Sequence, residues 1–131
     1  MKFLLVDDHF LFREGLKSIL TGQQSCQIVG TAETIAETIT KVEEVKPDLI
    51  LMNFNLPDGN GLEATQAILA KYPEVRIVFS TTNDQDECLL EAIRFGAIGY
   101  INKSASLNKF LAYIQSLKVD GDTSIENVYQ R

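Results

Sequence analysis

The sequence predicts an α/β fold, a doubly wound three-layer sandwich in which five strand–helix units build a parallel sheet of order 2-1-3-4-5. Two observations carry this prediction: short continuous apolar runs recur along the chain, and segments with helical spacing of apolar residues lie between them. Continuous apolar runs indicate strands covered on both faces, as in a parallel sheet between two helix layers. The runs cover residues 3–6, 28–29, 49–52, 77–79 and 100–101.

The helical segments follow these strands in order. Thr34 stands three residues before Glu37, the spacing of a capping box at a helix start, and Asp84 has the same spacing to Glu87. Gly96 has the position of a glycine that ends the fourth helix. The apolar stripes that define the first, second and fifth helices are Phe12, Leu16, Ile19 and Leu20; Ile35, Ile39 and Val42; and Leu107, Phe110, Leu111, Ile114 and Leu117.

Length and composition fit one globular domain. The chain of 131 residues is long enough to bury a core. Its composition, with 45% hydrophobic and 23% charged residues, excludes a disordered chain, a collagen and a coiled coil. The formal net charge of −6 argues against nucleic-acid or anionic-membrane binding by this domain. The apolar run 3–6 is too short for a signal peptide, and no run reaches the length of a membrane span. We therefore expect a soluble, cytoplasmic protein with no membrane partner.

Residues 1–118 are predicted to form the domain, and residues 119–131 a polar tail or the start of a linker, because apolar patterning stops at Val119. Two cysteines, Cys26 and Cys88, are too few for a disulfide scaffold and share no zinc-like spacing with the single histidine.

Polar residues stand where the predicted strands end. Asp7 and Asp8 follow the first strand, Asn53 the third, Ser80 the fourth, and Lys103 the fifth. The carboxyl ends of parallel strands share one edge of the sheet, and ligands bind there where the strand order reverses. The sequence therefore predicts that an acid pair, an amide, a hydroxyl and an ammonium group converge on one crevice.

Two adjacent carboxylates repel each other and favour a bound cation. Mg²⁺ prefers oxygen ligands and commonly bridges carboxylates to a phosphoryl group, whose other oxygens a hydroxyl and a lysine can bind. The simpler alternative is that Asp7 and Asp8 only close a strand and begin a turn.

Five segments in this order resemble the receiver domain of bacterial two-component response regulators, in particular receivers that precede a LuxR-type helix-turn-helix output domain. The resemblance covers residues 2–117 and implies a flavodoxin-like fold and a non-enzymatic module. The segments are 7–9 (DDH), 13–16 (REGL), 47–52 (PDLILM), 55–61 (NLPDGNG) and 99–103 (GYINK).

The resemblance also implies a magnesium site. Asp8 would ligate Mg²⁺ directly, Asp7 would assist, and the backbone carbonyl of Asn55 would be a further ligand. Asn53 stands at the position of the family's phosphoacceptor aspartate, where its side-chain oxygen could remain a metal ligand.

A second group of residues would, by the same resemblance, sense the phosphoryl group. Ser80 would be the hydroxyl that moves toward it, Lys103 the lysine that pairs with it, and Tyr100 the aromatic residue that rotates inward.

Asn53 departs from the family pattern. An amide has no anionic oxygen to attack phosphorus, so no acyl phosphate forms at this position, and the loss of a carboxylate weakens Mg²⁺ binding. Two origins stay open: an engineered change that holds the unphosphorylated state, or a natural pseudo-receiver that has lost its acceptor.

The resemblance implies a module of a phosphorelay that regulates transcription, with a sensor histidine kinase and an output domain as partners. No helix-turn-helix pattern follows Leu117, so an output domain would lie outside this sequence. An exposed Tyr113 near the last helix would leave room for a homodimer surface. The alternatives are a flavodoxin-like electron carrier binding FMN, which the acid pair disfavours, and an aspartate phosphohydrolase, which expects Asp-x-Asp rather than adjacent acids.

Overall fold

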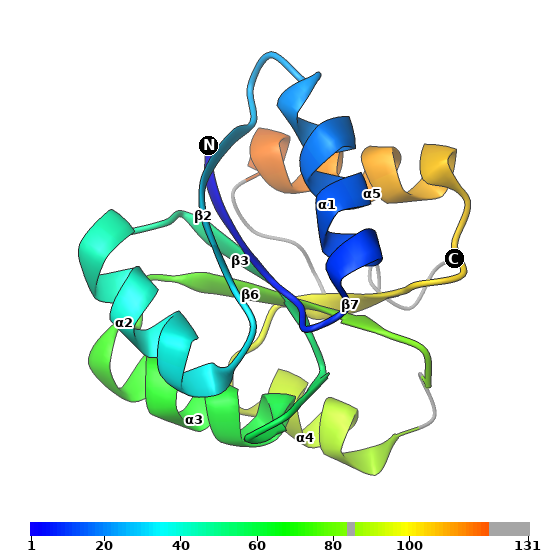
Figure 1. Cartoon of the computed structure of the whole chain (residues 1–131). Helices are drawn as coiled ribbons and strands as arrows, with labels where there is room; N and C mark the ends of the chain where they lie inside the picture. Colours follow the sequence, from blue (N-terminus) through cyan, green and yellow to red (C-terminus); the bar gives the residue numbers. More distant parts are fainter. Residues whose placement is uncertain (84–85, 121–131) are drawn as a thin grey trace.

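The computed structural model of the chain describes the backbone of residues 1–83 and 86–120 and the side chains of residues 1–83 and 86–117 (Figure 1). The sheet has five parallel strands in the order β2-β1-β3-β6-β7. Because β6 and β7 are the fourth and fifth strands of this sheet, the predicted order 2-1-3-4-5 is confirmed. The strands are β1 (Lys2–Val6), β2 (Gln27–Ala32), β3 (Leu49–Asn53), β6 (Arg76–Thr81) and β7 (Gly99–Asn102).

Helices cover both faces of the sheet, with α1 and α5 on one side and α2, α3 and α4 on the other (Figure 1). Alternate residues of each strand enter two separate cores: Leu4 and Val6 pack toward α2 and α3, whereas Phe3 and Leu5 pack toward α1 and α5. The continuous apolar runs of the sequence therefore reflect two buried faces. The helices are α1 (Phe10–Thr21), α2 (Ile35–Val45), α3 (Gly61–Lys71), α4 (Glu87–Arg94) and α5 (Leu107–Asp120).

Capping residues set the helix starts largely where the sequence predicted them. The Thr34 hydroxyl accepts the Glu37 N–H at 3.0 Å and begins α2. The N-cap of α4 is Asp86, whose carboxylate accepts the Cys88 N–H at 2.8 Å. Asp84, which the spacing to Glu87 had suggested, lies outside the described residues.

The predicted end of the fourth helix is confirmed, since Gly96 has a φ of 124° directly after the C-cap residue. Two expectations for α5 are wrong: Leu107 is 51% exposed rather than part of the core stripe, and Tyr113 is half-buried between both cores rather than exposed. Burial raises the pKa of the Tyr113 hydroxyl above its ordinary value. Helix α5 continues to Asp120, and the remainder of the predicted tail lies outside the described residues.

A small antiparallel hairpin, β4 (Asn55–Leu56) and β5 (Gly59–Asn60), follows β3 and leads into α3. Its turn residue Asp58 accepts the N–H groups of Ile35 and Ala36 at 2.8 and 3.1 Å, at the start of α2. These bonds hold the pKa of the Asp58 carboxyl below its ordinary value. The hairpin is thereby tied to a neighbouring helix, which fixes the backbone on one side of the carboxyl edge.

Within the described residues, no helix is both long enough and apolar enough to cross a membrane.

Gly61 begins α3 under two aromatic rings, Phe54 and Phe79, which meet edge to face with centroids 5.1 Å apart. A Cβ atom at residue 61 would overlap both rings. We therefore predict that Gly61→Ala lowers the free energy of unfolding by about 1–3 kcal/mol through overpacking, as measured by urea denaturation. The control is Gly15→Ala in α1, where no atom lies within 4 Å of the added Cβ, and where stability should rise by about 0.5–1 kcal/mol. Equal effects at the two positions would contradict this packing of α3.

Candidate functional site

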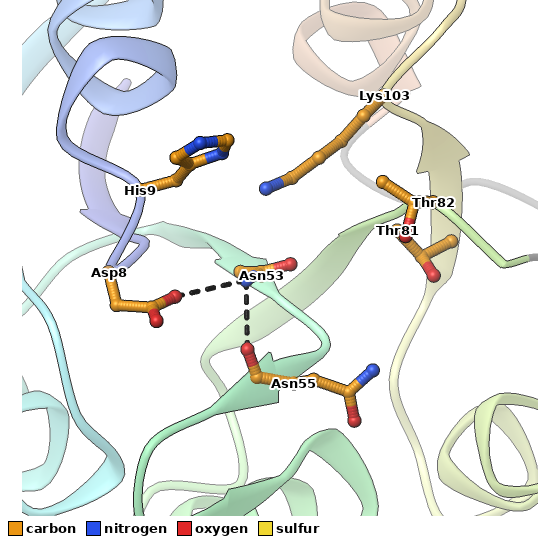
Figure 2. A pocket seen from close by; sticks show the side chains of 7 residues that line it. All are labelled: Asp8, His9, Asn53, Asn55, Thr81, Thr82 and Lys103. Carbon is orange, nitrogen blue, oxygen red and sulfur yellow. Dashed lines mark hydrogen bonds between the residues drawn. The ribbon is translucent and has the colours of Figure 1, made fainter.

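A polar pocket opens at the carboxyl edge of the sheet, where the strand order reverses between β1 and β3 (Figure 2). Elements distant in the sequence meet there: the segment after β1, the end of β3 with the hairpin, the end of β6 and the residue after β7. The convergence that the sequence predicted is therefore present for most of the residues concerned. The lining residues are Asp8, His9, Asn53, Asn55, Thr81, Thr82 and Lys103.

The two adjacent acids have different environments. Asp8 is exposed and lines the pocket, whereas Asp7 is 3% exposed and lies behind it. Asp7 Oδ1 accepts the His9 N–H at 2.8 Å, and Asp7 Oδ2 forms an ion pair with Lys103 Nζ at 2.9 Å. The two adjacent acids therefore differ: Asp7 is buried and paired with Lys103, whereas Asp8 faces the pocket.

Lys103 is held on two sides. Its Nζ lies 2.9 Å from Asp7 Oδ2 and 4.4 Å from the centroid of the Phe12 ring in α1. The side chain of Lys103 is only 11% exposed, so the ammonium group gains little from water and depends on these two partners.

The side-chain amide of Asn53 lies between oxygen atoms of the pocket (Figure 2). Its Nδ2 donates to Asp8 Oδ1 at 3.2 Å and to the backbone carbonyl of Asn55 at 2.8 Å. Both partners only accept hydrogen bonds, so the nitrogen of the amide must face them and the amide oxygen must point elsewhere. The orientation of Asn53 is therefore fixed by the chemistry of its neighbours.

This arrangement does not fit a magnesium ion. The carboxylate of Asp8 and the carbonyl of Asn55 are suitable ligands, but an N–H group points at both of them, and an N–H group cannot ligate a cation. Asp7 is engaged by Lys103. Among the residues that the structure describes, no three His, Cys, Asp or Glu side chains gather into a metal-binding group.

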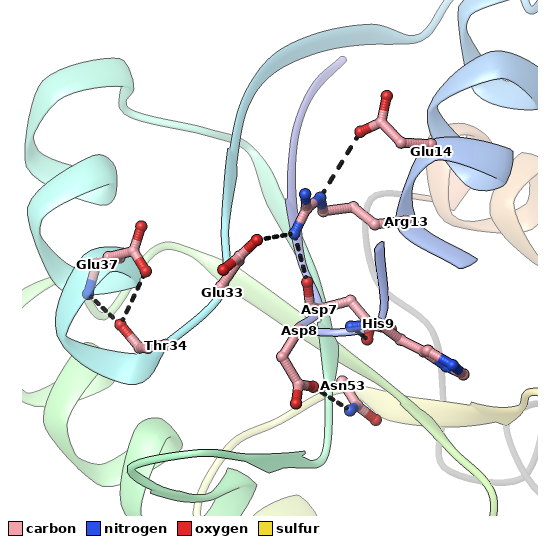
Figure 3. Close-up of polar contacts among 9 residues, drawn as sticks. All are labelled: Asp7, Asp8, His9, Arg13, Glu14, Glu33, Thr34, Glu37 and Asn53. Carbon is pink, nitrogen blue, oxygen red and sulfur yellow. Dashed lines mark hydrogen bonds and ion pairs between the residues drawn. The ribbon is translucent and has the colours of Figure 1, made fainter. Parts of the chain in front are cut away.

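Arg13 supports the acid pair from behind (Figure 3). It is 7% exposed and donates from one guanidinium nitrogen to the Asp7 carbonyl at 2.8 Å and to Glu33 Oε1 at 2.9 Å. Glu14 lies 3.7 Å from another nitrogen of the same group. In the sequence, Arg13 appeared only as part of the 13–16 segment. Its place among the apolar residues of α1 was the signal that could have predicted its burial.

The hydroxyl groups at the end of β6 differ from the prediction. Ser80 is 1% exposed and is not among the residues that line the pocket; Thr81 and Thr82 are. Ser80 pairs with Asn53 across β3 and β6, and strand alternation places both side chains on the face where Leu51 and Val78 pack. Thr81 ends the strand, and its hydroxyl bonds to the backbone N–H and carbonyl of Asn83 at 3.0 and 3.3 Å. The sequence had assigned both threonines only to the end of a strand.

Tyr100, the predicted switch residue, is 2% exposed and packs in the core toward α2, α3 and α4. Its ring therefore occupies an inward position and does not line the pocket.

The sheet order and the polar pocket at the switch point are those expected of the α/β fold that the sequence resembles. The chain belongs to the response regulator receiver domain family, whose model matches residues 3–115. Receiver domains generally bind Mg²⁺, and response regulators are generally transcription regulators rather than enzymes.

Relatives support a LuxR-type regulator. Response regulator GacA of Pseudomonas protegens is 36% identical over 115 residues, which cover 88% of this chain and 54% of the relative. Oxygen regulatory protein NreC of Staphylococcus aureus is 38% identical over 127 residues, covering 96% and 58%. A LuxR-family two-component response regulator from Aurantimonas has a solved structure that matches with a TM-score of 0.86 at 28% identity, covering 95% of this chain and 88% of that one.

The chain spans about half the length of the curated relatives it matches. Neither the family match nor these relatives support the electron-carrier alternative.

The buried ion pair generates a prediction. Lys103→Met leaves the Asp7 carboxylate buried without its cation and should lower the free energy of unfolding by about 3 kcal/mol, measured by urea denaturation. Adding Asp7→Asn should recover part of the loss, with a coupling energy of about 1–3 kcal/mol.

The matched control for this cycle is Asp8→Asn, which removes the neighbouring carboxylate that bonds to Asn53 rather than to Lys103. Its coupling to Lys103→Met should be small. If Asp8 couples to Lys103 as strongly as Asp7 does, the ion pair is not the specific contact described here.

Proposed function

We propose that the chain is the signal-receiver module of a two-component phosphorelay and controls a LuxR-type DNA-binding output domain without being phosphorylated at residue 53. Membership in the receiver family and the LuxR-type relatives support the first half of the proposal. A cytoplasmic location, a sensor histidine kinase as partner and a non-enzymatic role follow from the same assignment.

The observation that carries the second half is the chemistry of Asn53. The residue ends β3 at the carboxyl edge of the sheet and lines the pocket, and we assign it to the family's phosphoacceptor position. Phosphoryl transfer needs an anionic oxygen as nucleophile, and a neutral amide offers none. The nitrogen of this amide is also bound to Asp8 and to the Asn55 carbonyl, so the side chain is already engaged.

The remaining residues keep the roles expected of a receiver. Ser80, the direct neighbour of Asn53 across β3 and β6, keeps the role of the sensing hydroxyl. In a variant with aspartate at residue 53, Lys103 would leave Asp7 to pair with the phosphoryl group, and Tyr100 would couple the pocket to the surface near α4 and β7. Asp8 and the Asn55 carbonyl would hold Mg²⁺ only once the Asn53 amide no longer bonds to them, and Asp7 would assist once Lys103 has left it.

The test compares this chain with Asn53→Asp. Each is incubated with Mg²⁺ and a small phosphodonor such as acetyl phosphate, and the intact mass is measured. We expect a gain of one phosphoryl group in Asn53→Asp and none in the unaltered chain, because the change restores an anionic nucleophile beside the other pocket residues.

The control is the double variant Asn53→Asp with Asp8→Asn, which keeps the nucleophile and removes the carboxylate that faces the pocket. It should be phosphorylated far more slowly. A chain that gains the phosphoryl group with Asn53 in place, or an Asn53→Asp variant that never gains it, would overturn the proposal.

A further inference from the structure

We infer that the amide nitrogen of Asn53 is a built-in substitute for the divalent cation: it closes the acidic pocket to metal and does not simply leave the pocket one ligand short. The inference rests on the proposed function in one respect, the assignment of residue 53 to the phosphoacceptor position. It concerns what the side chain does in the folded protein, whatever the origin of the substitution.

The first argument is geometric. A cation bound by Asp8 and the Asn55 carbonyl would have to lie between their oxygen atoms, and Asn53 Nδ2 lies there instead, at 3.2 and 2.8 Å (Figure 2). Each N–H of the amide has one acceptor, so Asp8 Oδ1 and the Asn55 carbonyl oxygen each accept a hydrogen bond within the protein. A metal ion can enter only if the amide gives up both bonds.

The second argument is charge. Asp7 and Asp8 are the acids at the pocket, and Asp7 is neutralised by Lys103 at 2.9 Å. Only the carboxylate of Asp8 remains, and it is exposed to water and receives the partial positive charge of the amide. With an aspartate at residue 53 a second uncompensated carboxylate would face Asp8, and the repulsion between them would favour a cation. Asn53 removes this need and supplies the hydrogen-bond donor.

The inference separates two explanations of weak metal binding. If Asn53 weakens metal binding only because it lacks a carboxylate, the protein with alanine at residue 53 should bind metal no more tightly than the unaltered chain. If the Asn53 amide competes with the metal, deleting the amide should improve metal binding even though no ligand is added. The order of affinities for alanine and asparagine at residue 53 therefore decides between them.

The experiment uses Mn²⁺ as the probe, because free Mn²⁺ is counted directly by electron paramagnetic resonance and Mn²⁺ takes the oxygen ligands that Mg²⁺ does. The unaltered chain, Asn53→Ala and Asn53→Asp are titrated. We expect Asn53→Ala to bind Mn²⁺ about tenfold more tightly than the unaltered chain, the equivalent of one net hydrogen bond to a charged group. Asn53→Asp should bind more tightly still.

The control is Thr82→Ala, which enlarges the same pocket from the segment after β6 and leaves both bonds of the Asn53 amide in place. Its affinity for Mn²⁺ should equal that of the unaltered chain. Affinity in Asn53→Ala that is equal to or weaker than that of the unaltered chain would overturn the inference, because the amide would then be a neutral bystander or a ligand.

A second measurement observes the amide itself. In the unaltered chain, the side-chain N–H resonances of Asn53 should stay unchanged at the Mg²⁺ concentration that half-saturates Asn53→Asp, since the amide keeps both acceptors at that concentration. Their displacement at that concentration would contradict the inference. Failure here leaves the phosphorylation result untouched, because a chain without a nucleophile at residue 53 fails to gain a phosphoryl group whether or not it binds metal.

Discussion

Parallel strands deliver their carboxyl ends to one edge of the sheet, and the carboxylates collected there need polar partners. In this receiver domain both partners are side chains of the chain itself. Asp7, buried behind the pocket, takes Lys103 as its cation at 2.9 Å, and Asp8, facing the pocket, takes the amide nitrogen of Asn53 at 3.2 Å. The pocket is thus self-contained, and neither contact requires a metal ion or a phosphoryl group.

The surrounding fold holds these partners in position. The buried Arg13 donates to the Asp7 carbonyl and fixes the backbone where β1 leaves the sheet. Asp58 binds the start of α2 and steadies the hairpin that presents the Asn55 carbonyl. Phe12 covers the ammonium group of Lys103 from α1. Residues from both helix layers therefore hold the polar groups at this edge of the sheet in position.

Much of this could be predicted from sequence, because strand order and the convergence of Asp8, Asn53 and Lys103 follow from apolar periodicity and from where strands end. Other features depend on a phase of one residue, which periodicity does not resolve. Ser80 pairs with Asn53 in the sheet, yet the threonines one and two residues further along, Thr81 and Thr82, line the pocket. The direction of the Asn53 amide depends on three-dimensional neighbours and has no signature in the sequence.

In this chain an amide nitrogen lies between Asp8 and the Asn55 carbonyl, the groups that would otherwise hold a cation. A crystal of the unaltered chain, soaked at the Mn²⁺ concentration that half-saturates Asn53→Asp and recorded with anomalous diffraction above the manganese absorption edge, tests this arrangement most directly. The account predicts no anomalous peak between Asp8 and the Asn55 carbonyl, with Asn53 Nδ2 remaining bonded to both. A manganese peak at that point, with the amide turned away or ligating through its oxygen, would contradict the account.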